Sequence, residues 1–228
     1  LLLMAFSYLS ADTIVFPEQE WLSTIPESVG IESKKVEYLF NLAFEDQATQ
    51  SAVLIKNGYI IKERYSDSYN QESFGTSWSM AKSFYAALIG ISIDRGEINS
   101  LDDKVSDYID YYNDERSDIT IRQILNMTSG LDFPENEHES MFFRHDQIAY
   151  VKDVGIEKLP EQVFEYNNVN SMIVGEILKN ATGISAEILL EDRIFNAIGI
   201  DKFTLWKDGT GNPMTYCCID MSARDYSR

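Results

Sequence analysis

The stretch SWSMAKSFYAALIGISIDRG, residues 77–96, decides the fold of this chain. It is apolar on nearly every side after its first residues, and Gly96 is a typical helix end. A helix that is hydrophobic all round belongs in the middle of a protein. Lys82 nevertheless stands one helical turn after Ser79, although an unpaired buried amine costs several kcal/mol. The stretch therefore predicts a central helix whose lysine has a particular role.

The residues before this helix predict an irregular lead-in, a helix and a β-hairpin. Residues 31–46 place apolar side chains at helical intervals, and Ser33 is positioned to cap the helix start. Residues 51–66, SAVLIKNGYIIKERYS, predict two strands around Asn57-Gly58, the strongest short hairpin signal available. The order at the start of the chain is therefore helix, strand, strand.

The residues after the central helix predict mainly further helices. One short helix begins at Thr120 and ends before Gly130, and two more end at Gly183 and Gly199. From Phe203 onward the pattern is mixed and partly extended. We divide the chain into four predicted parts: a lead-in (1–30), an α/β part with the hairpin and the central helix (31–98), a helical domain (99–200) and the start of a return to the α/β part (201–228).

Composition limits the kinds of partner. The chain has 228 residues, is 44% hydrophobic and carries a formal net charge of -18, with a pI of about 4.4. This charge disfavours nucleic acid and anionic membranes as partners, and no run of residues is long and apolar enough to predict a membrane span. The apolar start, residues 1–12, fits either the end of a secretory signal or an element of the mature fold. The compartment, periplasmic or secreted against cytoplasmic, and the oligomeric state therefore stay open.

Cysteine and histidine are scarce. Cys217 and Cys218 are adjacent, and because neighbouring cysteines rarely pair, we interpret them as reduced or buried. No spaced set of Cys and His residues predicts a metal site. The two histidines, His138 and His145, lie in a polar stretch that predicts a solvated loop. Any hydrolytic chemistry must therefore use other groups.

Ser79 and Lys82 are the first candidates for such chemistry. Positions three apart on a helix share a face, so the spacing places an ammonium beside a hydroxyl. The lysine can stabilise the serine alkoxide by its charge and, with a pKa lowered by burial, can also accept the proton. The alternative is an ordinary serine at a helix start with a lysine that reaches solvent. This is the only S-x-x-K in the chain, and it lies at the start of the most apolar helix.

Tyr166 and Asn168 form a second candidate pair, just before a predicted helix. A phenol near an ammonium ionises more readily than usual, so Tyr166 could take the serine proton and later return it. Asn168 could donate to a substrate carbonyl or hold Lys82. The alternative is a core tyrosine and a capping asparagine. A second Tyr-x-Asn begins at Tyr111, but it lies in an acidic run that would raise the pKa of a tyrosine.

These stretches together resemble the serine β-lactamase and penicillin-binding protein superfamily. Within it, the chain is similar to the class C-related group of esterases, D-aminopeptidases and 6-aminohexanoate-dimer hydrolases. The stretches that carry the resemblance, in family order, are AVLIKNG, SMAK (79–82), ITIRQILNMTSGL, YNN (166–168) and DMSARDYSR. The resemblance implies an α+β, β-lactamase-like fold, with an antiparallel sheet flanked by helices and an all-helical domain.

The resemblance also implies acyl transfer. Ser79 would be the nucleophile, Tyr166 and Lys82 would share the proton transfers, and Asn168 and Trp78 would bind substrate. The expected substrate is a small ester, amide or β-lactam, and no cofactor or metal is implied. A penicillin-recognising sensor and an inactive relative are the alternatives.

The third family motif, a Lys/His-Thr/Ser-Gly sequence, does not occur in these residues. The nearest string, residues 207–211 (KDGTG), comes too early in the family order. We therefore expect that motif and the remaining core strands beyond Arg228, and an incomplete sheet within this chain.

Overall fold

The computed structural model describes residues 14–18, 20–134 and 136–228. Two compact units divide the described chain. The first contains the described part of residues 1–75 together with Ile198–Lys202 and Met221–Arg228, and the second contains Thr76–Ala197 and Phe203–Asp220. The prediction for residues 1–12 lies outside the described residues, and the four-part division of the chain stays a prediction.

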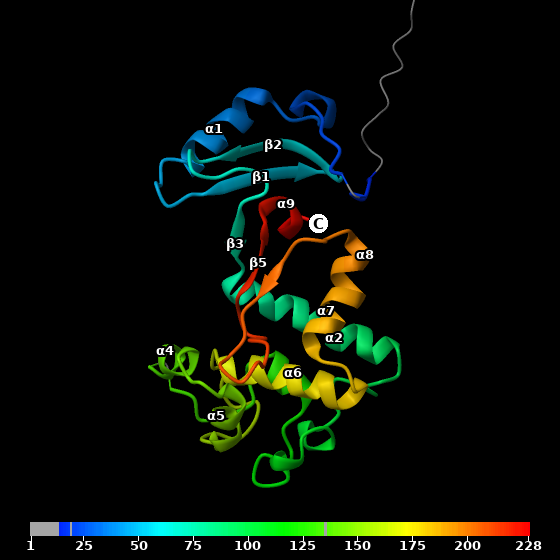
Figure 1. The fold of residues 1–228 in the computed structure, drawn as a ribbon, viewed down its shortest axis with the longest axis vertical. Helices are drawn as coiled ribbons and strands as arrows, with labels where there is room; N and C mark the ends of the chain where they lie inside the picture. The colour runs from blue at the N-terminus through cyan, green and yellow to red at the C-terminus, as the bar shows by residue number, and fades with distance from the viewer. Residues whose placement is uncertain (1–13, 19, 135) are drawn as a thin grey trace, which may run out of the picture. The chain divides into compact units, whose positions relative to one another are not determined.

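The first unit is built on the predicted hairpin. Strands β1 (Ser51–Lys56) and β2 (Tyr59–Tyr65) pair antiparallel, and the turn residues Asn57 and Gly58 both have positive φ, 54° and 81°. Helix α1 (Ser33–Ala43) lies along the hairpin (Figure 1). Its buried side chains share a small hydrophobic core with the 3₁₀ turn η1 (Pro26–Val29) and β2: Val29, Val36, Phe40 and Ile61. The predicted order of helix, strand and strand is confirmed, although Glu32 rather than Ser33 is the N-cap residue.

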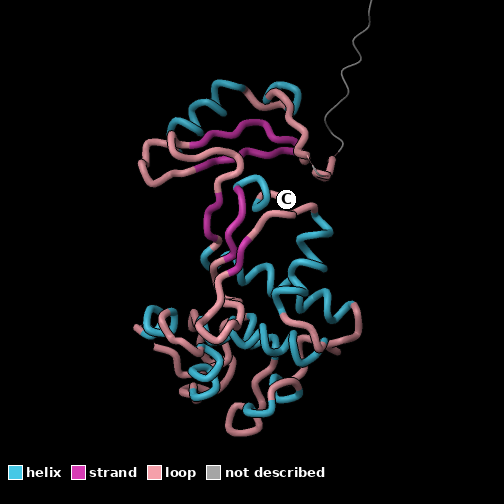
Figure 2. The backbone as a smooth tube through the Cα atoms, viewed as in Figure 1, coloured by secondary structure: helices cyan, strands magenta, loops and turns pink. Residues whose placement is uncertain are grey.

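The second unit is mainly helical (Figure 2). Its central helix α2 (Ala81–Asp94) packs on α6 (Asn168–Thr182), and residues such as Leu88, Ile89 and Ile173 are fully buried between the elements. This agrees with the apolar pattern that predicted a central helix. The remaining helical segments, some of them single turns, are η3 (Val105–Asp107), η4 (Asp110–Tyr112), α3 (Ile121–Leu125), α4 (Glu137–Phe142), α5 (Gln147–Asp153), α7 (Ala186–Leu190), a π-helical turn (Glu191–Phe195) and α8 (Asn196–Ile198).

Three short strands and a final helical turn complete the described elements. Strand β5 (Ile219–Ser222) lies between β3 (Phe74–Thr76) and β4 (Thr204–Leu205) in one sheet, and β4 and β5 pair antiparallel. Helix α9 (Ala223–Tyr226) follows directly. The β5 pairing brings the residues just before Ile219 close to the start of α2, because Ser77 N–H donates to Ile219 O at 2.7 Å.

The predicted α+β fold class is confirmed, with antiparallel strand pairs and a predominance of helices. Gly183 and Gly199 end helical segments in the left-handed conformation, as predicted, with φ of 73° and 75°. The helix that begins after Thr120 is shorter than predicted, because α3 ends at Leu125 and a loop leads to Gly130. Among the described residues, no helix is long and apolar enough to cross a bilayer.

Candidate active site

Ser79 lies in a single 3₁₀ turn, η2 (Trp78–Met80), that leads directly into α2. The turn is fixed from outside the helix: Ser77 N–H donates to Ile219 O, and Ile219 N–H donates to Ser77 Oγ at 3.0 Å. Trp78 has a φ of 45°, in the left-handed region that costs an ordinary residue about 1–3 kcal/mol. The result is an exposed serine at the positive end of a long helix, where developing negative charge is stabilised.

The structure brings the three predicted reactive side chains together. Lys82 Nζ donates to Ser79 Oγ at 3.0 Å, and the Tyr166 hydroxyl donates to the same oxygen at 2.6 Å. Tyr166 comes from the loop before α6, so the contact joins elements far apart in sequence. A lysine and a tyrosine therefore converge on one serine oxygen, as the sequence predicted.

Two further contacts hold the lysine. Lys82 Nζ also donates to the backbone oxygen of Tyr216 at 2.8 Å. The ammonium lies 5.0 Å from the ring centroid of Tyr166 and 5.7 Å from that of Tyr216, within the range of cation–π attraction. No sequence pattern predicts the role of Tyr216, because any residue can supply a backbone carbonyl.

Lys82 and Tyr166 shift each other's pKa in opposite directions, and burial acts against each of these shifts. Burial lowers the pKa of Lys82, although its interaction with Tyr166 partly restores it. Burial raises the pKa of Tyr166, but hydrogen bonding to Lys82 and Ser79 and the charge of Lys82 outweigh this, so that the pKa falls below 10.0. Both groups therefore lose a proton more readily than they would in water.

Asn168 is placed differently from the prediction. It begins α6, but the N-cap of that helix is Asn167, whose side chain accepts from Val169 N–H at 2.8 Å. Asn168 Nδ2 lies 2.9 Å from His138 Nδ1, and no hydrogen bond joins Asn168 to Lys82 among the described residues. Its Oδ1 atom is buried and has no hydrogen-bond partner within the described part of the chain. The proposed contact with substrate stays a prediction.

The two histidines differ. His138 is half-buried in α4 rather than in a solvated loop, so that prediction was wrong. Its ring stacks on Tyr166 at a centroid distance of 5.9 Å and meets Phe133 edge-on at 4.7 Å. A depression of about 440 Å³ is lined by these three residues and Glu165. Within the six residues of α4 only Met141 is buried, so the sequence offered little signal for this helix. His145 is exposed in a loop, as predicted.

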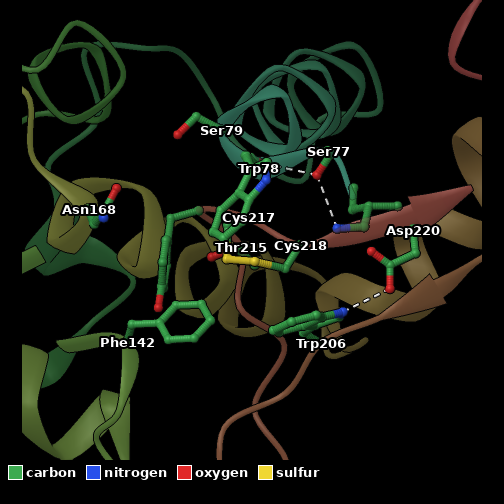
Figure 3. The surroundings of a disulfide bond; sticks show 12 residues. Ser77, Trp78, Ser79, Phe142, Asn168, Trp206, Thr215, Cys217, Cys218 and Asp220 are labelled. Carbon is green, nitrogen blue, oxygen red and sulfur yellow. Dashed lines mark hydrogen bonds between the residues drawn. A yellow bond between two sulfur atoms is a disulfide. The ribbon is translucent and has the colours of Figure 1, made fainter. Parts of the chain in front are cut away.

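Aromatic side chains lie beside the serine turn. Trp78 is 61% exposed, and its ring lies 6.5 Å from Phe142, which in turn lies 5.9 Å from Trp206. Figure 3 shows these three rings around the pair Cys217 and Cys218. The prediction that Trp78 binds substrate stays a prediction, and its exposure leaves the indole face accessible.

Cys217 and Cys218 form a disulfide between neighbouring residues, with an S–S distance of 2.11 Å (Figure 3). The prediction of burial is confirmed, because the two residues are 5% and 1% exposed, but the prediction of reduced thiols was wrong. Cys218 has a φ of 69°, a conformation rare for residues other than Gly, Asn or Asp. This positive φ departs from ordinary backbone geometry, in which neighbouring cysteines rarely pair.

Two features were discounted as parts of the site: the KDGTG string and Tyr111, whose pKa is raised as predicted. Lys207, the lysine of the KDGTG string, forms an ion pair with the Glu187 carboxylate of α7 at 2.7 Å. Burial and then the hydrogen bond to the Glu176 carboxylate raise the pKa of Tyr111 far above its usual value. Within the described residues, no group of three or more His, Cys, Asp or Glu side chains could hold a metal ion.

The fold and this geometry define a class of protein: an α+β chain with a lysine and a tyrosine gathered on one serine at the start of its central helix. Residues 45–215 match the model of the Beta-lactamase family. The match covers about three quarters of the sequence, and the chain therefore belongs to that family.

Individual proteins are similar to this chain in sequence or in fold. Penicillin-binding protein 4 of Amycolatopsis lactamdurans is 29% identical over 137 residues, which cover 58% of this chain and 36% of the relative. A Bacillus anthracis structure assigned as a 6-aminohexanoate-dimer hydrolase superimposes with a TM-score of 0.72 and 21% identity, covering 84% of this chain and 54% of that one. EstCE1, a hydrolase with promiscuous acyltransferase activity, superimposes with a TM-score of 0.70 and 15% identity. That match covers 85% of this chain and 70% of EstCE1. The chain thus spans about a third to a half of the length of the first two.

Proposed function

We propose that this chain carries the acylation site of a serine hydrolase that cleaves ester or amide bonds through an acyl-enzyme. The observation that supports this most strongly is the convergence of Lys82 Nζ and the Tyr166 hydroxyl on Ser79 Oγ, at 3.0 and 2.6 Å. A serine hydroxyl is a weak nucleophile until a neighbouring group takes its proton and a charge stabilises the oxygen. Here one partner supplies a charge and the other a phenol whose pKa is lowered.

The reaction follows from the positions of these groups. Ser79 Oγ forms a bond to the substrate carbonyl carbon, and its proton passes to the Tyr166–Lys82 pair. The negative oxygen of the intermediate is stabilised at the start of α2, where the backbone N–H of Ser79 is one donor. Collapse breaks the bond to the leaving alcohol or amine, which takes that proton. Water then attacks the Ser79 ester and gives its own proton to the same pair, the acid leaves, and Ser79 Oγ is reprotonated.

The surroundings of Ser79 favour substrates with an apolar group beside the carbonyl. Trp78 is the sequence neighbour of the nucleophile, and its ring is part of the aromatic surface formed with Phe142 and Trp206. Such rings bury an aliphatic or aryl group. Two relatives are described as hydrolases, one of a 6-aminohexanoate dimer, which agrees with a small ester or amide as the substrate.

Labelling with a fluorophosphonate probe tests the proposal in the full-length protein that contains this chain. We expect one covalent adduct by intact mass, mapped to Ser79 and absent from the Ser79→Ala variant. Ser83→Ala is the matched control, because Ser83 is an exposed serine on the same helix and should leave labelling unchanged. A folded protein with no adduct on Ser79 would refute the proposal.

A turnover measurement distinguishes a hydrolase from the alternative, a penicillin-recognising sensor. That alternative is suggested by one relative, which is named a penicillin-binding protein. We expect steady release of product from p-nitrophenyl butyrate, with an acyl-enzyme that decays. A Ser79 adduct with a β-lactam that persists for hours, without ester turnover, would favour the sensor instead.

A further inference from the structure

The disulfide lies, in the sequence, between Tyr216 and Ile219, two residues that hydrogen-bond to the segment from Ser77 to Lys82. On one side, the Tyr216 carbonyl accepts from Lys82 Nζ at 2.8 Å. On the other side, Ile219 accepts from Ser77 N–H at 2.7 Å and donates to Ser77 Oγ at 3.0 Å. The Cys217–Cys218 pair therefore lies, in the sequence, between the carbonyl that holds Lys82 and the residue that holds the turn with the serine. Figure 3 shows the disulfide together with Ser77, Trp78 and Ser79.

The bond also constrains the backbone at this point. A disulfide between adjacent residues closes a small ring that contains their peptide bond, so rotation at Cys217 and Cys218 is restricted. Cys218 lies at a φ of 69°, which an unconstrained cysteine rarely adopts. Its carbonyl accepts from Trp206 N–H at 3.0 Å, and Cys217 N–H donates to Met214 O at 3.0 Å. The ring is thus part of a hydrogen-bonded segment.

We propose that the Cys217–Cys218 disulfide is a positioning element of the acylation site, which keeps the Tyr216 carbonyl against the Lys82 ammonium and so keeps Lys82 beside Ser79. This inference rests on the proposed function. The reduced protein is the less active form, and a low-molecular-weight thiol, itself oxidised to its disulfide, converts the oxidised form into it.

We expect the Tyr216 carbonyl to move when the bond opens. Ile219 is held by two hydrogen bonds to Ser77, so relaxation of Cys218 to negative φ displaces the Tyr216 end. Lys82 then loses this acceptor while it stays half-buried beside the Tyr166 ring, and its ammonium is no longer held against Ser79 Oγ. In the reduction itself the disulfide gains two electrons and two protons and becomes two thiols. With a phosphine as reductant, the phosphorus is oxidised to the phosphine oxide and the oxygen comes from water.

The test compares oxidised and reduced protein in the fluorophosphonate assay. Intact mass and thiol counting first establish the redox state of Cys217 and Cys218 after purification without reductant. We expect tris(carboxyethyl)phosphine to lower the acylation rate of the folded protein about 10- to 100-fold, the loss that one charge-assisted hydrogen bond implies. The Cys217→Ala/Cys218→Ala double variant should be equally slow and no longer respond to the phosphine. It also supplies the open-chain state if the buried sulfur atoms resist reduction.

The pH profile distinguishes positioning from a general loss of structure. Loss of the carbonyl acceptor destabilises the charged form of Lys82, so the limb of the profile that reports Lys82 should move to lower pH. Among the described residues, the titratable groups around the ammonium are the phenols of Tyr166 and Tyr216. A partly unfolded protein would instead lose amplitude with the limb unmoved.

Three results would overturn the inference, and they are distinguishable. Two free thiols in protein purified without reductant would show that the bond does not form. An unchanged rate and pH limb, after verified reduction of a protein that is acylated when oxidised, would show that the bond does not position Lys82. If even the oxidised protein is not acylated at Ser79, the proposed function fails, and this inference fails with it.

Discussion

Replacement of Lys82 by methionine removes the ammonium and keeps a side chain of similar length and packing. The ammonium donates to Ser79 Oγ at 3.0 Å and to Tyr216 O at 2.8 Å, and hydrogen bonds to a charged group contribute about 1.5–3 kcal/mol each. The loss of the bond to Ser79 and of proton transfer should together raise the acylation barrier by about 3–5 kcal/mol, or a factor of about 10²–10⁴. We expect the variant to stay folded, because an apolar side chain replaces a half-buried charge.

The assay is the second-order rate of fluorophosphonate labelling at Ser79, measured from pH 6 to pH 10 beside a thermal melt. Lys34→Met, at an exposed position on α1, is the control and should leave both measurements unchanged. The pH profile gives a second test, because Lys82 lowers the pKa of Tyr166 while burial raises it. Without Lys82, that pKa should rise and the remaining activity should appear only at higher pH. A Lys82→Met protein that labels within tenfold of wild type, with the same pH profile, would refute the role assigned to the lysine.

Three further predictions follow from the second unit. Tyr166→Phe should slow acylation about 10²–10⁴-fold. It should also remove the increase in acylation rate with rising pH, because we assign that limb of the pH profile to ionisation of Tyr166, whose pKa is lowered. A pH profile that keeps this limb would contradict the assignment. Trp78→Ala should raise KM for p-nitrophenyl butyrate several-fold more than for the acetate, with kcat little changed, and equal effects on the two esters would argue against an apolar subsite. Glu97→Gln should destabilise the fold by about 1–3 kcal/mol, because the carboxylate pairs with the buried Arg193 at 2.6 Å. Arg193 lowers the pKa of Glu97, so this stability is present above the unfolded pKa of about 4.3 and is lost as pH falls through the folded value; denaturant melts of both proteins at pH 7 and pH 3 should therefore converge at the lower pH.

Local signals predicted local structure well. Asn57 and Gly58 have the positive φ values that their hairpin requires. The spacing of Ser79 and Lys82 places the ammonium within hydrogen-bonding distance of the hydroxyl. Each of these depends on only a few neighbouring residues. The meeting of Tyr166 with Ser79 spans 87 positions, and only the resemblance to a family, not the spacing, predicted it.

The features that the sequence did not reveal depend on backbone geometry or on distant packing. The acceptor at Tyr216 is a carbonyl, which carries no side-chain signature. His138 was assigned to a loop because its polar neighbours outweighed a helix of only six residues. The usual backbone conformation of two adjacent residues predicts no bond between Cys217 and Cys218. The bond forms with Cys218 in a left-handed conformation, which cysteine rarely adopts. In each case the deciding quantity is a torsion or a contact that other parts of the fold impose.

The position of Lys82 in an apolar helix has the same kind of explanation. Helical spacing puts its ammonium near Ser79, but one neutral hydroxyl does not offset the cost of removing a charge from water. The additional support comes from the carbonyl of Tyr216, 134 positions away, and from the rings of Tyr166 and Tyr216. The isolated helix would therefore leave its lysine in solvent, with an ordinary pKa. The half-buried Lys82 with its lowered pKa thus has a hydrogen-bond acceptor in the segment before β5. The backbone around Cys217 and Cys218 is therefore as much a part of the surroundings of Lys82 as the S-x-x-K spacing.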